Sequence, residues 1–120
     1  MADGLADRRC VPCRGGTPPL TPEQIAPLLM QLQGWSIVED YKLYKRFRLR
    51  NFSEAMDLAN SVARIADEEG HHPDLYVAWG ELRVYLWTHK IAGLTESDFI
   101  MAAKIDRVAG QLGLEEPPSP

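Results

Sequence analysis

The chain has 120 residues, enough for one domain with its own core but not for two. Hydrophobic residues make up 45% and charged residues 25% of the sequence, as in an ordinary globular protein. The formal net charge of −4 argues against nonspecific nucleic-acid binding. No apolar run is long enough for a membrane span or a secretory signal. We therefore expect a cytoplasmic protein with no nucleic-acid and no membrane partner.

Both ends of the chain have the composition of loops. Residues 1–18 contain several glycines and prolines without hydrophobic periodicity, so we expect a flexible N-terminal tail there. Cys10 and Cys13 have the spacing of a metal or redox pair, but one pair is only half of a zinc site and a loop follows it. We expect reduced thiols with no assigned role. A single domain should cover 19–115, and 116–120 should be a frayed end.

Seven elements are expected between these ends, and each helix begins with capping residues. The three capping pairs are Thr21 with Gln24, Asn51 with Glu54, and Thr95 with Asp98. In chain order we expect a helix at 21–33, strands at 35–38 and 41–50, a helix at 51–70, strands at 75–79 and 82–87, and a helix at 95–112. The order α-β-β-α-β-β-α predicts an α+β fold, with three helices packed on one face of a four-stranded antiparallel sheet.

Two details of the strands bear on the fold. In the strand at 41–50, Lys45 interrupts an apolar face, and the opposite face is basic. Such a basic face is more typical of the solvated side of a half-buried sheet than of a site for an anionic partner. Between the last two strands, Gly80-Glu81 matches the two residues of a type II′ turn.

The three histidines of the chain are expected at one end of this sheet. His71 and His72 directly follow the long central helix, and His89 follows the last strand. With the expected hairpin turn, residues 74 and 88 lie nearly opposite each other. His89 should therefore lie close to the His71-His72 pair.

Such a cluster has three possible explanations. Imidazoles, with an unperturbed pKa of about 6.5, can act as general acid and base. Three histidines can also hold zinc, although the adjacent pair does not converge easily on one ion. They can finally be structural hydrogen-bond partners. We favour acid–base chemistry without a metal, with Asp67, one helical turn before His71, placed to orient that histidine.

The residues around the histidines resemble the pterin-4a-carbinolamine dehydratases. The resemblance lies in DEEGHHP at 67–73, THKIAGLTESD at 88–98 and Gly34-Trp35, and it extends over about residues 20–112. It implies an enzyme that dehydrates 4a-hydroxytetrahydropterin to quinonoid dihydropterin. Such an enzyme recycles the pterin cofactor of aromatic amino-acid hydroxylases such as phenylalanine hydroxylase. The pterin is then the substrate, and neither a metal nor another cofactor is implied.

The resemblance also implies roles for individual residues. His71 and His89 would be the acid–base pair, and His72 would mainly hold the pterin. The substrate-binding residues would be Asp67, Pro73, Trp35 and Asp98. Two of them have ordinary alternatives, because Trp35 can be plain core and Asp98 can simply cap a helix.

Members of this family are dimers or tetramers, so the resemblance implies a homodimer or homotetramer. Some vertebrate members also bind a homeodomain transcription factor. A non-catalytic interaction or coactivator-type protein on the same scaffold is therefore the alternative function.

Overall fold

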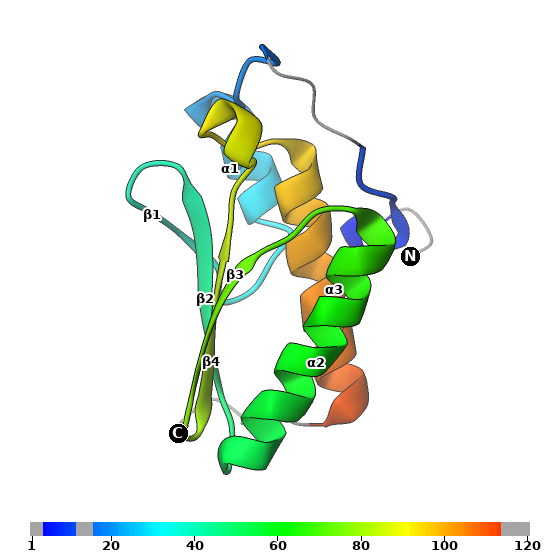
Figure 1. Ribbon diagram of the computed structural model, residues 1–120. Coiled ribbons are helices and arrows are strands. Elements are labelled where there is room, and N and C mark those ends of the chain that lie inside the picture. The colour runs from blue at the N-terminus through cyan, green and yellow to red at the C-terminus, as the bar shows by residue number, and fades with distance from the viewer. Residues whose placement is uncertain (1–3, 12–15, 114–120) are drawn as a thin grey trace.

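One antiparallel sheet backed by helices makes up the fold (Figure 1). The computed structural model describes residues 4–11 and 16–113. Its elements are the 3-10 helix η1 (Leu5–Asp7), α1 (Pro22–Leu29), β1 (Ser36–Val38), β2 (Lys42–Arg48), α2 (Phe52–Glu69), β3 (Asp74–Ala78), β4 (Glu81–Leu86), the 3-10 helix η2 (His89–Ile91) and α3 (Glu96–Leu112). The predicted α+β class and the order of the seven main elements are confirmed. Among the described helices, none is long and apolar enough to cross a membrane.

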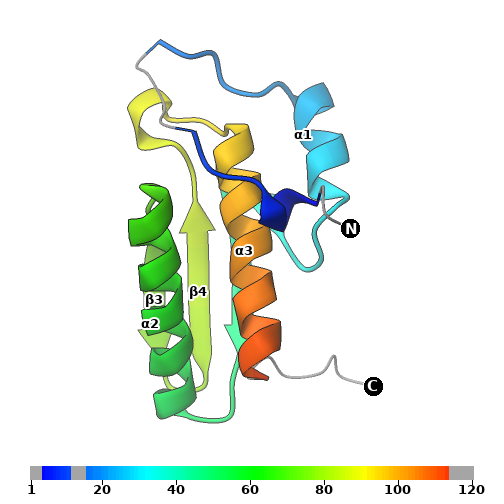
Figure 2. The same ribbon diagram turned by 90° about the vertical axis from the view of Figure 1, so that its right-hand side faces the viewer.

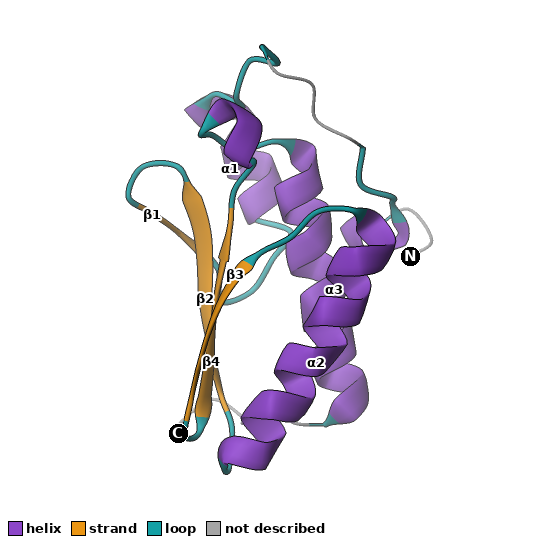
Figure 3. Ribbon diagram, viewed as in Figure 1, coloured by secondary structure: helices purple, strands orange, loops and turns teal. Residues whose placement is uncertain are grey.

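The helices all lie on the same side of the sheet. The strands are ordered β1-β2-β4-β3, and each neighbouring pair is antiparallel. Figures 2 and 3 show α2 and α3 crossing one face of this sheet, with α1 beside α3. Alternate side chains of the two central strands are fully buried beneath the helices: Leu43, Phe47, Leu82, Val84 and Leu86. Each such side chain contributes about 1.5–3 kcal/mol of hydrophobic stabilisation, so the core lies between the sheet and the helices.

The opposite face of β2 is open, as its basic pattern indicated. Arg46 and Arg48 are exposed there. Arg46 Nε donates a hydrogen bond of 2.8 Å to Oε1 of Glu81 on β4. The basic face is therefore the solvated side of the sheet, partly neutralised across the strands.

A largely buried ion pair accounts for the lysine on the apolar face of β2. Lys45 Nζ lies 2.8 Å from Oδ1 of Asp106 on α3 and donates to the carbonyl oxygen of Gln33 at 3.1 Å. The lysine side chain is only 10% exposed. Nε1 of Trp35 donates to the other oxygen of the same carboxylate at 2.9 Å. Asp106 thus ties the segment before β1 and the centre of β2 to α3.

The β3–β4 hairpin turns one residue earlier than predicted. Ala78 pairs with Glu81, so the two loop residues are Trp79 and Gly80 rather than Gly80 and Glu81. Gly80 has a φ of 74° in the second loop position, whereas a type II′ turn requires positive φ in the first. Its carbonyl oxygen accepts a hydrogen bond of 2.8 Å from the amide of Leu49. That contact with the end of β2 helps to place the turn.

The first described segment lies against α3. Leu5 is 3% exposed, and Nη2 of Arg107 on α3 lies 2.6 Å from Oδ1 of Asp7. Lys104 on the same helix donates to the carbonyl oxygen of Ala6 at 2.9 Å. This part of the expected N-terminal tail is therefore packed on the domain. Residues 1–3, 12–15 and 114–120, which include the predicted C-terminal end, lie outside the described residues.

Candidate active site

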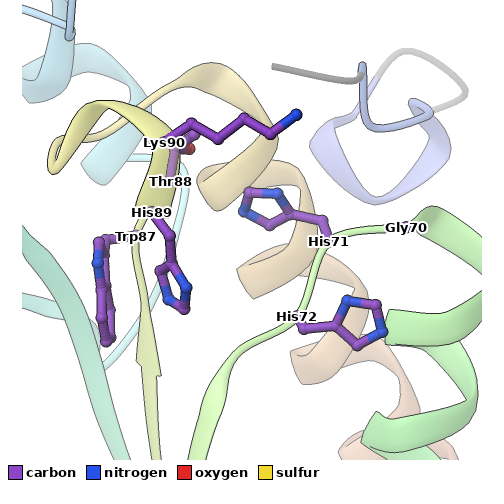
Figure 4. Close-up of a pocket in the computed structure, with 7 residues that line it drawn as sticks. All are labelled: Gly70, His71, His72, Trp87, Thr88, His89 and Lys90. Carbon is purple, nitrogen blue, oxygen red and sulfur yellow. The ribbon is translucent and has the colours of Figure 1, made fainter. Parts of the chain in front are cut away.

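An open pocket at one end of the sheet brings the three histidines together (Figure 4). Its volume is about 230 Å³. It lies between the loop that joins α2 to β3 and the segment that leads from β4 into η2. The residues that line it are Gly70, His71, His72, Trp87, Thr88, His89 and Lys90.

The end of α2 determines how the two adjacent histidines point. Gly70 caps the helix in the left-handed conformation, with a φ of 66°, which glycine adopts without steric cost. The chain leaves the helix there, and Pro73 favours an extended backbone for the residue before it. The two imidazoles consequently diverge, and Figure 4 shows that His72 points toward α2 whereas His71 points away from it.

A fully buried carboxylate on α3 holds His71. Nε2 of His71 lies 2.6 Å from Oδ1 of Asp98, whose side chain is completely buried. The second oxygen of Asp98 accepts hydrogen bonds of 2.9 Å from Thr88 Oγ1 and from the amide of Thr95. An ionised carboxylate only accepts hydrogen bonds, so this contact fits the tautomer of His71 with the proton on Nε2. In that tautomer Nδ1 is the ring nitrogen that can accept a proton.

Asp67 contacts His72 rather than His71. Its Oδ1 lies 3.0 Å from Nε2 of His72, and both side chains are well exposed. The predicted pairing with His71 assumed that helical periodicity continued past residue 70. The left-handed Gly70 ends that periodicity, so the prediction that Asp67 orients His71 is wrong. Asp98 makes that contact instead.

His89 is more open than His71 and has fewer polar contacts. Its side chain is 55% exposed, and its Nε2 lies 4.0 Å from Oδ1 of Asp74 at the start of β3. Its ring centroid lies 4.2 Å from that of Trp87. The hairpin register places Tyr85, not residue 88, opposite Asp74. The predicted register was therefore wrong, although the structure does place His89 near the start of β3.

None of the four predicted substrate-binding residues is among those that line the pocket, and Asp67 reaches it only beside His72. Trp35 is 7% exposed and packs edge-on against Phe47 in the core, so the plain-core alternative describes it. Pro73 connects the histidine loop to β3 but is not one of the lining residues. Asp98 reaches the pocket only through His71 and Thr88.

Four lining residues were not predicted, and the first of them, Gly70, directly precedes His71. Trp87, Thr88 and Lys90 are sequence neighbours of His89, and that proximity was the available signal. Thr88 also forms an isolated bridge with Gly93, which closes the loop that carries His89. Among the residues that the structure describes, no three His, Cys, Asp or Glu side chains are grouped as ligands of one metal ion would be.

Comparison with known proteins relates this site to a family. Residues 18–108 match the family model described as pterin 4 alpha carbinolamine dehydratase. A protein of Rubrobacter xylanophilus named "Putative pterin-4-alpha-carbinolamine dehydratase" is 51% identical over 104 residues, which cover 87% of this chain and 97% of that protein. A protein of Rickettsia bellii with the same name is 50% identical over 103 residues, covering 85% of this chain and 91% of the relative.

A solved structure has the same fold. It is described as transcriptional coactivator/pterin dehydratase from Brucella melitensis, and it is 32% identical to this chain with a TM-score of 0.73. The match covers 78% of this chain and 100% of that one. The matched residues include the whole histidine pocket. The chain belongs to the pterin-4-alpha-carbinolamine dehydratase family.

Proposed function

We propose that the protein dehydrates 4a-hydroxytetrahydropterin to quinonoid dihydropterin by histidine general acid–base catalysis. The observation that carries the proposal is the placement of His71, His72 and His89 around one pocket in a chain of this family. The reaction is that of a hydro-lyase, because water is lost and nothing is oxidised.

The chemistry needs two proton transfers. The hydroxyl on C4a must be protonated to leave as water, and the proton on N5 must be removed. Imidazoles serve both needs near neutral pH, and each positioned acid or base typically contributes ~10²- to 10⁴-fold to the rate. His71, with Nε2 held by Asp98, and His89, which is open to solvent, form the acid–base pair in this proposal.

The third histidine serves binding in this proposal. His72 is turned toward Asp67 on α2 and is well exposed. An exposed imidazole beside a carboxylate offers hydrogen bonds to the polar edge of a pterin. We therefore assign His72 and Asp67 to holding the substrate, at the rim of the pocket.

The proposed biological role follows from the product. Quinonoid dihydropterin is the form from which the pterin cofactor of aromatic amino-acid hydroxylases, such as phenylalanine hydroxylase, is regenerated. The pterin is the substrate here, and the proposal calls on no further cofactor. We also propose that the protein is a homodimer or homotetramer and that it acts in the cytoplasm.

The test is the decay of carbinolamine absorbance with protein treated with a chelator. His71→Ala and His89→Ala should each slow turnover by at least ~10²-fold, with unchanged circular dichroism. Gln31→Ala, at an exposed position two residues after the end of α1, is the control and should keep the wild-type rate. A wild-type rate in both histidine variants would contradict the proposed acid–base mechanism.

A coactivator-type role is the second candidate, because the Brucella melitensis neighbour is described as both a coactivator and a dehydratase. In that case the scaffold binds a regulator without needing titrating groups. Absence of turnover by the wild-type protein, together with recovery of a transcription regulator by both wild-type and His71→Ala protein, would favour this role over the enzyme.

A further inference from the structure

The indole of Trp87 lies against the imidazole of His89, and the proposed reaction assigns it no role. The two ring centroids are 4.2 Å apart with an interplanar angle of 38°, and Figure 4 shows the rings side by side at the edge of the pocket. In the described part of the chain, the other close group is Asp74, at 4.0 Å from Nε2. That distance is beyond a hydrogen bond.

The two histidines proposed as acid and base are therefore held in different ways. His71 is 12% exposed and bonded to a buried carboxylate at 2.6 Å. His89 is 55% exposed, and its ring lies against the tilted indole of Trp87. An exposed imidazole without an anchor would sample several rotamers, so the indole is the group that can restrict it.

Trp87 is itself held from β2. The pair Leu43 and Leu86 is in register, which places residues 42 and 87 side by side on the next step of the two strands. Nζ of Lys42 lies 4.6 Å from the centre of the indole ring, a distance typical of a cation–π contact. Tyr41 packs edge-on against the same ring, with centroids 6.2 Å apart.

The cation at this contact is stable over the neutral range. Desolvation acts to lower the pKa of Lys42, but the hydrogen bond and charge of Glu39, with smaller contributions from Tyr41 and Asp74, raise that pKa overall. Lys42 Nζ lies 3.3 Å from Oε2 of Glu39. A row of contacts thus runs from Glu39 through Lys42 and Trp87 to His89.

We propose that Trp87 is a positioning residue for His89: its indole, held by Lys42, keeps the imidazole in the orientation that faces the pocket. The placement of the indole against His89 follows from these contacts alone. The expected effect of Trp87 on turnover also rests on the proposed dehydratase function. Trp87 acts through His89 and is not itself an acid or base.

The first test measures the position of the His89 ring by NMR. Its ring-proton resonances are assigned by their loss in His89→Gln. In Trp87→Leu, these resonances should move downfield toward those of a free histidine, because the ring current of the indole is gone. Trp87→Phe should give an intermediate shift. The matched control is Trp79→Leu at the hairpin tip, a 72% exposed tryptophan, which should leave them unchanged. Resonances that do not move in Trp87→Leu would overturn the placement.

The second test separates positioning from substrate binding. Trp87→Leu should lower kcat roughly 10- to 100-fold, since a misplaced catalytic group loses about that much, while KM changes little. Trp87→Phe should restore most of the rate, and Lys42→Met should give a smaller loss. A raised KM with unchanged kcat would show that the indole binds the pterin instead, and would overturn the proposal. If wild-type protein has no turnover, the dehydratase proposal fails, and the NMR test still decides whether the indole of Trp87 lies against the His89 ring.

Discussion

Asp98 Oδ1 lies 2.6 Å from Nε2 of His71, although the two residues are 27 positions apart in the chain. The carboxylate is fully buried, and it also bonds Thr88 next to His89. A single side chain on α3 therefore fixes the geometry of both segments that carry the proposed acid and base.

Replacing this carboxylate should impair turnover more than its helix-capping role explains. Asp98→Asn keeps the size of the side chain but removes its charge, so His71 loses an acceptor that fixes its tautomer. We expect kcat to fall by ~10²-fold, comparable to losing an acid–base catalyst. Stability should fall by about 1–3 kcal/mol, since buried hydrogen bonds to a charged group are lost. Turnover kinetics and urea unfolding measure the two effects; an unchanged kcat would contradict this account.

Asp67 provides the matched comparison, because it is the carboxylate that pairs with the exposed histidine. The Asp67–His72 contact is open to solvent, and exposed ion pairs contribute ~1 kcal/mol or less. Asp67→Asn should leave the unfolding midpoint nearly unchanged and raise KM rather than lower kcat. A loss of kcat as large as that of Asp98→Asn would indicate that Asp67 acts on the proton transfers after all.

The Lys45–Asp106 pair offers a test of stability away from the pocket. Lys45→Met removes the ammonium group that lies 2.8 Å from Asp106, and removing one partner of a buried pair costs about 3 kcal/mol. The double variant with Asp106→Leu should recover part of this loss, because the carboxylate that Lys45 contacts is removed with it. Denaturant unfolding of the four proteins measures the coupling. Additive losses in the free energy of unfolding would show that the two residues are not coupled. Turnover of the folded proteins should stay at the wild-type level.

The N-terminal segment can be tested through its buried leucine. Leu5 is 3% exposed against α3, so Leu5→Ala should destabilise the protein by about 2–3 kcal/mol. Val11→Ala, at a 70% exposed side chain in the same segment, should change stability by less than ~0.5 kcal/mol. Thermal unfolding of the two variants makes the comparison. Equal stabilities would mean that the segment does not pack on the domain in solution.

Cys10 gives a prediction of pH dependence. Burial, together with the negative charge of Glu69, raises the pKa of Cys10 from its ordinary value of 9.0 to about 11. With Cys13 replaced by serine, alkylation of the remaining thiol should be slow at neutral pH and accelerate only as the pH approaches about 11. An ordinary exposed thiol would react fast well below that pH. Cys13 lies outside the described residues, so its replacement only isolates Cys10.

The same raised pKa affects folding, with a defined sign. Below pH 9.0 the thiol is protonated in both the folded and the unfolded chain, and its contribution to stability is complete. Between 9.0 and about 11 the unfolded chain loses the proton first, so stability falls as the pH rises. Cys10→Ser has no titrating thiol and should lack this part of the decline. Identical pH profiles of unfolding for the two proteins would contradict a buried, neutral thiol.

Local patterns in the sequence were sufficient for the elements of this fold. Capping boxes at Thr21–Gln24 and Thr95–Asp98 are present as predicted, because both partners of each lie within one helical turn. Alternation along β2 correctly separated the buried Leu43 and Phe47 from the exposed arginines. The histidine loop was also located correctly, since a helix-terminating glycine followed by His-His-Pro is a local signal.

Long-range partners could not be read in the same way. From the sequence, Lys45 interrupts an apolar strand face without an evident partner. Its ion-pair partner Asp106 lies 61 residues later in the chain. The hairpin was misplaced by one residue, because Gly80 suits more than one loop position and the contact with Leu49 that favours this one comes from another strand. Trp87 was taken as the end of a strand, and only the packing of Lys42 and His89 around it indicates a role.

The sequence by itself determined the fold class and the presence of three histidines near one sheet end, because helix and strand periods, caps and glycines act over a few residues. The tertiary structure alone decided which carboxylate each imidazole meets. Asp67 is four residues from His71, yet the left-handed turn at Gly70 sends that histidine to α3 and leaves Asp67 with His72. Such pairings depend on the relative placement of packed elements, and no local spacing encodes that placement.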